Sequence, residues 1–117
     1  MRVLLAEDHP LISYLMVGML ESLGHEVVAV WDGCEAKACL LRGEVFNVII
    51  TDNEMPGMNG VDLVVWFVTE FEVTRKTKVI ISSGCDSPRI GELCDKYADV
   101  FSLPKPVDVG RLEAHLS

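Results

Sequence analysis

Acidic side chains follow two of the short apolar runs in this sequence, at the points where buried strands would end. Apolar residues 48–50 precede Asp52, and apolar residues 3–6 precede Glu7 and Asp8. Open α/β sheets build their sites from side chains that a strand delivers to a loop at its carboxyl end. A carboxylate in such a place can act as a nucleophile. We therefore predict that Asp52 accepts a phosphoryl group.

The three carboxylates of Glu7, Asp8 and Asp52 would repel one another if they shared one crevice. A hard divalent cation relieves that repulsion, and Mg²⁺ prefers oxygen ligands while keeping waters and a phosphate oxygen. A trio of acids fits Mg²⁺ or Mn²⁺ better than it fits Zn²⁺. The sequence thus predicts a magnesium or manganese site. Without Asp52 at a matching strand end, Glu7 and Asp8 would be interpreted as a solvated loop.

Two further groups that phosphoryl transfer requires follow the later apolar runs. Transfer to a carboxylate needs an in-line nucleophile and positive charge around the equatorial oxygens. Lys105, after residues 100–103, supplies a cation on a flexible stem. Ser83, after residues 79–81, offers a hydroxyl donor, and Gly84 beside it leaves room for the phosphoryl group. Each could be an ordinary surface residue, so the prediction depends on four strand ends carrying groups of the required types.

Apolar runs alternate with amphipathic segments along the rest of the chain, which predicts strands alternating with helices. The runs themselves do not alternate in polarity, as is typical of strands covered on both faces. Connections of helical length imply a parallel sheet with helices on both sides. The expected strands are 2–6, 27–30, 46–51, 79–81 and 100–103. The expected helices are 10–23, 33–42, 61–71, from 86 or 87 to about 97, and 107–116, with a surface connection at 72–78.

The strand order does not follow from periodicity. If the order is 2-1-3-4-5, the carboxyl ends of the first and third strands are neighbours at the point where the winding of the sheet reverses. Ligands of open α/β sheets bind at that point. Glu7, Asp8 and Asp52 would then share one crevice. The fold class expected is α/β, a doubly wound, five-stranded parallel sheet of the flavodoxin-like (βα)5 type.

Length and charge limit the possible functions. The 117 residues fit one domain, 1–117, and ten Lys plus Arg against eighteen Asp plus Glu give a net charge of −8. That balance argues against nucleic-acid binding and against an anionic membrane surface. No apolar stretch reaches the ~18 residues of a spanning helix, so a cytoplasmic protein is expected. No metal-binding spacing relates the four cysteines, which are expected to be free thiols: Cys34, Cys39, Cys85 and Cys94.

Four motifs resemble those of a response-regulator receiver domain of bacterial two-component signalling, of the chemotaxis-regulator type. They are LLAEDHP (residues 4–10), IITDNEMPGMNG (49–60), VIISSG (79–84) and LPKP (103–106). Each motif is weak by itself, but in this order and spacing they are highly specific, and the resemblance covers essentially the whole chain. It implies a phospho-accepting signalling domain of a phosphorelay that is not an enzyme beyond its own phosphorylation and dephosphorylation.

The resemblance also implies roles for particular residues. Asp52 would be phosphorylated from a phosphohistidine on a histidine kinase or histidine phosphotransfer protein. The backbone carbonyl of Glu54 would join the three acids as a magnesium ligand. Ser83 matches the switch hydroxyl of the family, and Lys105 matches its lysine. In the family, phosphorylation draws that hydroxyl toward the phosphoryl group and changes the surface of helix 4, strand 5 and helix 5, which would bind an effector or a second copy.

Three positions depart from the pattern of the family or extend it. The family often has an aromatic residue three places before its lysine, where this chain has Ser102. Phe101 comes one place earlier and should face the other way by strand alternation, which leaves the mode of switching open. Glu54, two places after Asp52, should line the entrance to the phosphoryl group and affect the rates of transfer or hydrolysis. Cys85 should lie near the same entrance.

Three other functions are considered. A receiver-like interaction module that phosphorylation does not switch is suggested by Ser102. A phosphatase that forms an aspartyl phosphate is disfavoured, because it would carry a second aspartate where this chain has Glu54 and because the chain lacks a cap. A flavodoxin-like module is disfavoured because Glu7 and Asp8 would repel the flavin phosphate. The sequence leaves open whether the chain stands alone or belongs to a longer regulator or hybrid kinase.

Overall fold

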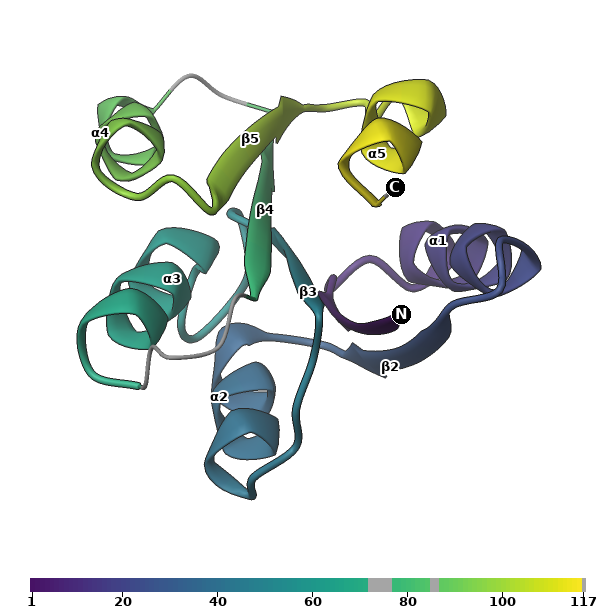
Figure 1. The fold of residues 1–117 in the computed structure, drawn as a ribbon, viewed down its shortest axis with the longest axis horizontal. Helices are drawn as coiled ribbons and strands as arrows, with labels where there is room; N and C mark the ends of the chain where they lie inside the picture. The colour runs from purple at the N-terminus through teal and green to yellow at the C-terminus, as the bar shows by residue number, and fades with distance from the viewer. Residues whose placement is uncertain (72–76, 85–86, 117) are drawn as a thin grey trace.

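Strands and helices alternate along the chain in the computed structural model, which describes residues 1–71, 77–84 and 87–116 (Figure 1). The strands are β1 (Arg2–Ala6), β2 (Glu26–Val30), β3 (Val48–Asp52), β4 (Lys78–Ser83) and β5 (Val100–Pro104). The helices are α1 (Pro10–Ser22), α2 (Gly33–Leu41), α3 (Gly60–Thr69), α4 (Pro88–Lys96) and α5 (Val109–Leu116). The predicted succession of strands and helices is confirmed.

The strands form one parallel sheet in the order β2-β1-β3-β4-β5. The predicted doubly wound, flavodoxin-like fold is therefore confirmed, and its winding reverses between β1 and β3. Asp52 lies opposite Ser82 across β3 and β4, and Ser83 lies opposite Pro104 across β4 and β5. This register brings the carboxyl ends of β3, β4 and β5 to one edge of the sheet, beside the end of β1.

Helices cover both faces of the sheet. Figure 1 shows α1 and α5 on one side and α2, α3 and α4 on the other. Val3 and Leu5 of β1 belong to the core that includes residues of α1 and α5, whereas Leu4 and Ala6 belong to the core that includes residues of α2, α3 and α4. Because neighbouring strand residues enter different cores, nearly every position of the inner strands β1, β3 and β4 is buried, and the half-buried exceptions are Arg2, Lys78 and Ser83. This explains the apolar runs without alternation.

Side-chain caps set where two of the helices begin. Asn59 accepts the N–H of Asp62 at 2.8 Å at the start of α3. Asp108 accepts the N–H of Arg111 at 3.0 Å, so α5 begins at residue 109 rather than at the predicted residue 107. Of the predicted connection at 72–78, residues 72–76 lie outside the described residues, and residue 78 already belongs to β4.

The apolar side chains of α1 are divided between the core and the surface. Leu20 is fully buried, whereas Leu11 and Leu15 are each 59% exposed and Tyr14 is 75% exposed. Helical spacing of apolar residues therefore overstates how much of this helix enters the core. The exposed residues belong to the helix that follows Glu7 and Asp8. Across the described parts of the chain, none of the helices combines the length and the apolar character needed to span a bilayer.

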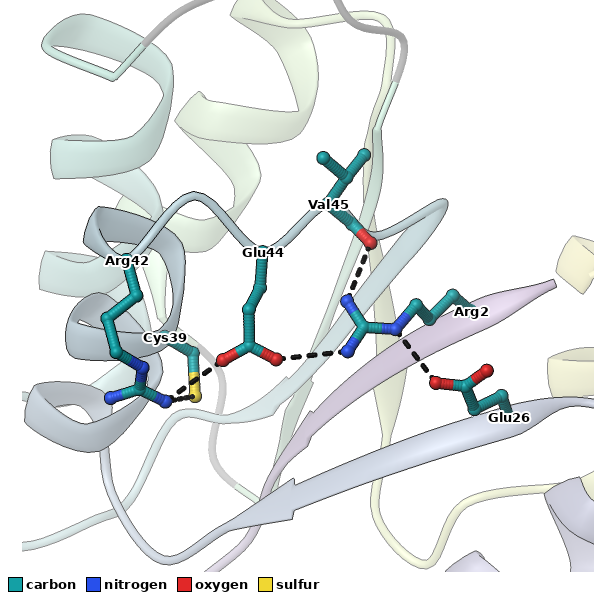
Figure 2. A network of polar contacts seen from close by, with 6 residues as sticks. All are labelled: Arg2, Glu26, Cys39, Arg42, Glu44 and Val45. Atoms are coloured by element: carbon teal, nitrogen blue, oxygen red, sulfur yellow. Dashed lines mark hydrogen bonds and ion pairs between the residues drawn. The ribbon is translucent and has the colours of Figure 1, made fainter.

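A network of ion pairs lies at the amino edge of the sheet (Figure 2). The Arg2 guanidinium donates to Glu26 at 2.9 Å, to Glu44 at 3.0 Å and to the carbonyl of Val45 at 3.1 Å. Arg42, which follows α2, donates to the other carboxylate oxygen of Glu44 at 2.9 Å. These contacts join β1 to β2 and to the segment that enters β3. We call Arg2, Glu26, Arg42 and Glu44 the amino-edge network.

Candidate functional site

Three acidic side chains meet at the opposite edge, where β1 and β3 end. Glu7, Asp8 and Asp52 each place a carboxylate oxygen within 4.8 Å of the other two. Glu7 and Asp52 are only 4% and 3% exposed, whereas Asp8 faces solvent. An all-oxygen donor set that opens to water on one side suits Mg²⁺ or Mn²⁺, so these residues fit a divalent cation. We call Glu7, Asp8 and Asp52, together with Lys105, the acidic site.

The crowding of these acids is visible in the electrostatics of Glu7. Burial raises the pKa of the Glu7 carboxyl above its ordinary value, and the nearby Asp52 carboxylate adds to this rise. The backbone N–H of His9, which donates to Glu7 Oε2 at 3.0 Å, lowers the pKa of Glu7 but does not cancel the rise. The Glu7 carboxylate is therefore held in a place where a positive charge would stabilise it.

Lys105 is the cation that contacts Asp52. Its Nζ lies 2.7 Å from Asp52 Oδ1, and the same oxygen accepts the N–H of Glu54 at 3.2 Å. Burial lowers the pKa of Lys105, but the hydrogen bond and charge of Asp52 raise it above its ordinary value overall. The backbone N–H of Lys105 donates to the carbonyl of Ser83 at 3.0 Å, which fixes the lysine beside the end of β4. The peptide between Lys105 and Pro106 is cis.

Ser83 and Gly84 reach the same edge from β4, and both contact Glu54. The Ser83 hydroxyl donates to Glu54 Oε2 at 2.9 Å, and the Gly84 N–H donates to Glu54 Oε1 at 2.9 Å. A Cβ at Gly84 would lie 3.8 Å from Glu54 Oε1 and 3.9 Å from Lys105 Cδ, so this glycine lines the space between those two side chains. The sequence predicted Ser83 and Gly84 at the site but did not predict that Glu54 would bind them.

The loop between β3 and α3 depends on Asn53 and Gly60, which sequence reasoning did not single out as site residues. The Asn53 N–H donates to the carbonyl of Ser82 at 2.8 Å, and its side chain accepts the N–H of Val61 at 2.9 Å. A Cβ at Gly60 would lie 2.5 Å from the carbonyl oxygen of Asp52, so only glycine allows α3 to start there. Asn and Gly beside a strand end are the available signal, because both residue types build turns.

Ser102 and Phe101 lie on different sides of β5. The Phe101 ring packs against His115 of α5, with ring centroids 4.8 Å apart. Ser102 lines a hollow of about 530 Å³ with residues of β4 and the first turn of α4, including Ser83 and Ile90. The structure thus has a small polar residue, lining the same hollow as Ser83, at the position where the family resemblance favours an aromatic ring. Cys85 lies outside the described residues.

A larger cavity, of about 600 Å³, extends from the acidic site between α1 and α5. Its polar end includes Glu7, Asp52 and Lys105. Its remaining lining is mostly apolar and includes Ile12 and Leu15 of α1. Glu7 and Asp52 therefore share a cavity whose other walls are mostly apolar.

Comparison with known proteins agrees with this geometry. The family model described as the response regulator receiver domain matches residues 3–117. The sensory/regulatory protein RpfC of Xanthomonas campestris pv. campestris is 32% identical over 113 residues, which are 96% of this chain and 15% of RpfC. The sensor protein TorS of Escherichia coli is 28% identical over 121 residues, 98% of this chain and 13% of TorS. The chain thus spans less than a sixth of these relatives.

Solved receiver domains share the fold. The receiver domain of the Francisella response regulator 1452 has a TM-score of 0.81 and 27% identity, covering 98% of this chain and 92% of that one. The receiver domain of a sensor histidine kinase from Pseudomonas aeruginosa PAO1 has a TM-score of 0.82 and 26% identity, covering 98% and 93% of the two chains. That structure has a magnesium ion coordinated in its active-site cleft.

Proposed function

This chain belongs to the response regulator receiver domain family, and from that premise we propose that Asp52 accepts a phosphoryl group from a phosphohistidine on a partner protein. The observation that carries the proposal is the contact of buried Asp52 with Lys105 at 2.7 Å, next to two further carboxylates within 4.8 Å. Asp52 thus has the Lys105 ammonium beside it, and together with the other two carboxylates it offers ligands for a divalent cation. Both are required for transfer to a carboxylate.

In the proposed reaction, a carboxylate oxygen of Asp52 attacks the phosphorus of the phosphohistidine. A new oxygen–phosphorus bond forms while the bond from phosphorus to the imidazole nitrogen breaks, and that nitrogen keeps the electron pair and takes up a proton. The Lys105 ammonium would stabilise the negative charge on Asp52 before transfer and the charge on the phosphoryl oxygens during it. Magnesium or manganese, when bound by Glu7, Asp8, Asp52 and the backbone carbonyl of Glu54, would neutralise part of that charge.

After transfer, the Ser83 hydroxyl and the Gly84 N–H would bind phosphoryl oxygens. Movement of the end of β4 would then change the surface made by α4, β5 and α5, and so alter binding to an effector or to a second copy. Because Ser102 lies beside Ser83, this change would not depend on an aromatic ring at that position. The domain would act on no separate substrate, so it is a signalling module rather than an enzyme in the usual sense.

The phosphodonor would be a histidine kinase or a histidine phosphotransfer protein. The similarity to RpfC and TorS, named as sensory and sensor proteins, supports such a partner. The exposed apolar side chains of Leu11, Tyr14 and Leu15 on α1 offer a contact surface next to the acids. A donor that covered this surface would bring its imidazole to the cavity at which Asp52 lies.

One other function has an observation in its favour. A receiver-like interaction module, in which phosphorylation leaves the partner surface unchanged, is favoured by Ser102 and by the packing of Phe101 against His115. The two functions differ in the structural consequence of phosphorylation. Amide NMR spectra recorded with and without beryllofluoride and Mg²⁺ would separate them, because the switched domain must show changes in α4, β5 and α5 and the unswitched module must not.

The chemistry is tested by intact mass after incubation with Mg²⁺ and acetyl phosphate. We expect the protein to gain one phosphoryl group and Asp52→Ala to gain none. Asp95→Ala, which removes an exposed carboxylate of α4, is the matched control and should gain the group like the original protein. If the protein gains nothing and beryllofluoride with Mg²⁺ does not bind, Asp52 is not a phosphoryl acceptor and the proposal fails.

A further inference from the structure

The Glu54 carboxylate is bound to two donors at the end of β4. Its Oε2 accepts from the Ser83 hydroxyl and its Oε1 from the Gly84 N–H, both at 2.9 Å. Burial by itself would raise the pKa of this carboxyl, but the two donors and the charge of Lys105 lower it overall. Each carboxylate oxygen thus has its own donor, and the bridge joins the loop after β3 to the end of β4.

These donors are connected to the proposed phosphoryl acceptor through Glu54 and Lys105. Glu54 follows Asp52 by two residues and donates its own N–H to Asp52 Oδ1 at 3.2 Å. The carbonyl of Ser83 accepts the N–H of Lys105 at 3.0 Å, and Lys105 contacts Asp52 at 2.7 Å. The space beside Gly84 lies between Glu54 Oε1 and the Lys105 stem, 3.8 and 3.9 Å from a Cβ built there. Anionic oxygens attached to Asp52 would therefore approach donors that already hold an anion.

We propose that the Glu54 carboxylate is an internal stand-in for the phosphoryl group, which holds the Ser83 hydroxyl and the Gly84 N–H until phosphorylation of Asp52 displaces it. This inference rests on the proposed function, because it takes Asp52 as the acceptor. On phosphorylation the two donors exchange carboxylate oxygens for phosphoryl oxygens, so the number of charge-assisted hydrogen bonds that they make is unchanged. The displaced carboxylate moves into solvent.

The exchange makes Glu54 a residue that opposes occupation of the site by a phosphoryl group. An incoming anion must break two hydrogen bonds to a charged group before it can use the donors, and it meets a like charge while doing so. Removing the carboxylate removes both costs. We expect Glu54→Ala to bind a phosphoryl mimic about tenfold more tightly, which corresponds to about one charged hydrogen bond.

The first measurement tests the contact without any phosphoryl group. Amide hydrogen exchange of Gly84 is compared in the protein, in Glu54→Ala and in Glu54→Gln, with Glu92→Ala as the control that removes an exposed charge from α4. We expect exchange at Gly84 to be about tenfold faster in Glu54→Ala, intermediate in Glu54→Gln, whose amide oxygen can accept one bond, and unchanged in the control. Unchanged exchange in Glu54→Ala would overturn the inference.

The second measurement tests displacement. Beryllofluoride is titrated in the presence of Mg²⁺ into the same four proteins, and the dissociation constants are obtained by calorimetry. Tighter binding by Glu54→Ala, with the control unchanged, supports the inference. Equal or weaker binding overturns it. If none of the proteins binds beryllofluoride, the proposed function fails, and the role of Glu54 as a stand-in for the phosphoryl group fails with it. The exchange data at Gly84 would still show whether Glu54 binds the Gly84 N–H.

Discussion

At the amino edge of the sheet each acid of the network contacts an arginine, whereas at the carboxyl edge three acids lie close together and one lysine, Lys105, contacts Asp52. Glu44 accepts from Arg2 at 3.0 Å and from Arg42 at 2.9 Å, and these hydrogen bonds lower the pKa of its carboxyl. Glu7 shows the opposite behaviour, because burial and the Asp52 carboxylate raise the pKa of its carboxyl. Charge is balanced within the protein at one edge and left in excess at the other.

This difference separates two uses of charged side chains. The arginine of β1 presents a planar fork that joins three segments at once, and it needs nothing from outside the protein. The acidic site holds more negative than positive charge in a place where two of its acids are buried. Such a cluster is destabilising until a cation joins it, which is why crowded acids indicate a functional site rather than a structural one.

The largest effect should come from removing one carboxylate from the acidic site, with removal of one carboxylate from the amino-edge network as the control. Asp52→Asn and Glu44→Gln both replace a carboxylate by an amide of the same shape. We expect Asp52→Asn to abolish phosphorylation and to weaken Mg²⁺ binding about tenfold or more, because one of three charged ligands is lost. Glu44→Gln should change neither property. Calorimetric titration with Mg²⁺ measures the affinity of each variant. Equal losses in both variants would mean that the cation responds to total charge and not to the acidic site.

The edge that carries the acidic site could be predicted from the sequence because it depends on where strands end. Strand ends follow from local apolar runs, and a parallel sheet brings the carboxyl ends together once its order is known. Asp52, Lys105 and Ser83 each come two places after such a run, so their positions needed no knowledge of loop conformation. The order 2-1-3-4-5 came from the family resemblance, since periodicity carries no information about which strands are neighbours.

Contacts that depend on loop shape could not be predicted in this way. The carboxylate of Glu54 reaches Ser83 and Gly84 only because the loop after β3 folds back toward β4, and neither residue type nor spacing specifies that path. The amino-edge network depends on a segment between α2 and β3 that carries no strand signal at Glu44. Helical periodicity likewise could not show that Leu15 remains exposed, because exposure depends on how far α5 lies from α1.

The next largest effect concerns stability at the amino edge. Arg2→Met keeps an unbranched side chain over the Phe46 ring but removes the donors to Glu26 and Glu44. We expect a melting temperature lower by a few degrees, with Mg²⁺ affinity and phosphorylation unchanged, as measured by thermal unfolding. The melting temperature of Arg2→Lys should lie between that of Arg2→Met and that of the original protein, because an ammonium keeps the charge but cannot form the planar fork of a guanidinium.

An exposed ion pair supplies the control for that experiment. Arg89 lies 3.4 Å from Asp62, and both side chains are at least half exposed. Surface pairs of this kind add little to stability, so Arg89→Met should leave the melting temperature nearly unchanged. A fall as large as that of Arg2→Met would show that any lost arginine has the same effect, and that the amino-edge network has no special role.

The smallest effect is a difference in the pH dependence of stability at the two edges, measured without metal. The pKa of Glu44 is lower in the folded protein than in the unfolded chain. Its contribution to stability is therefore fully present above the unfolded-state pKa and is lost as the pH falls through the folded-state pKa. The pKa of Glu7 is higher in the folded protein, so its ionisation costs stability as pH rises from the unfolded value through the folded one.

Chemical unfolding in EDTA, from well below the ordinary glutamate pKa of about 4.3 up to about pH 7, would measure both effects, because the pKa of Glu44 lies below its ordinary value and the pKa of Glu7 lies above it. Near neutrality we expect Glu44→Gln to be less stable than the original protein and Glu7→Gln to be more stable. Both differences should shrink toward acid, because a protonated carboxyl and an amide carry the same charge. If Glu7→Gln instead lowers stability near neutrality, the hydrogen bond from His9 outweighs the repulsion from Asp52, and the acidic site is not a region of unrelieved charge in the metal-free protein.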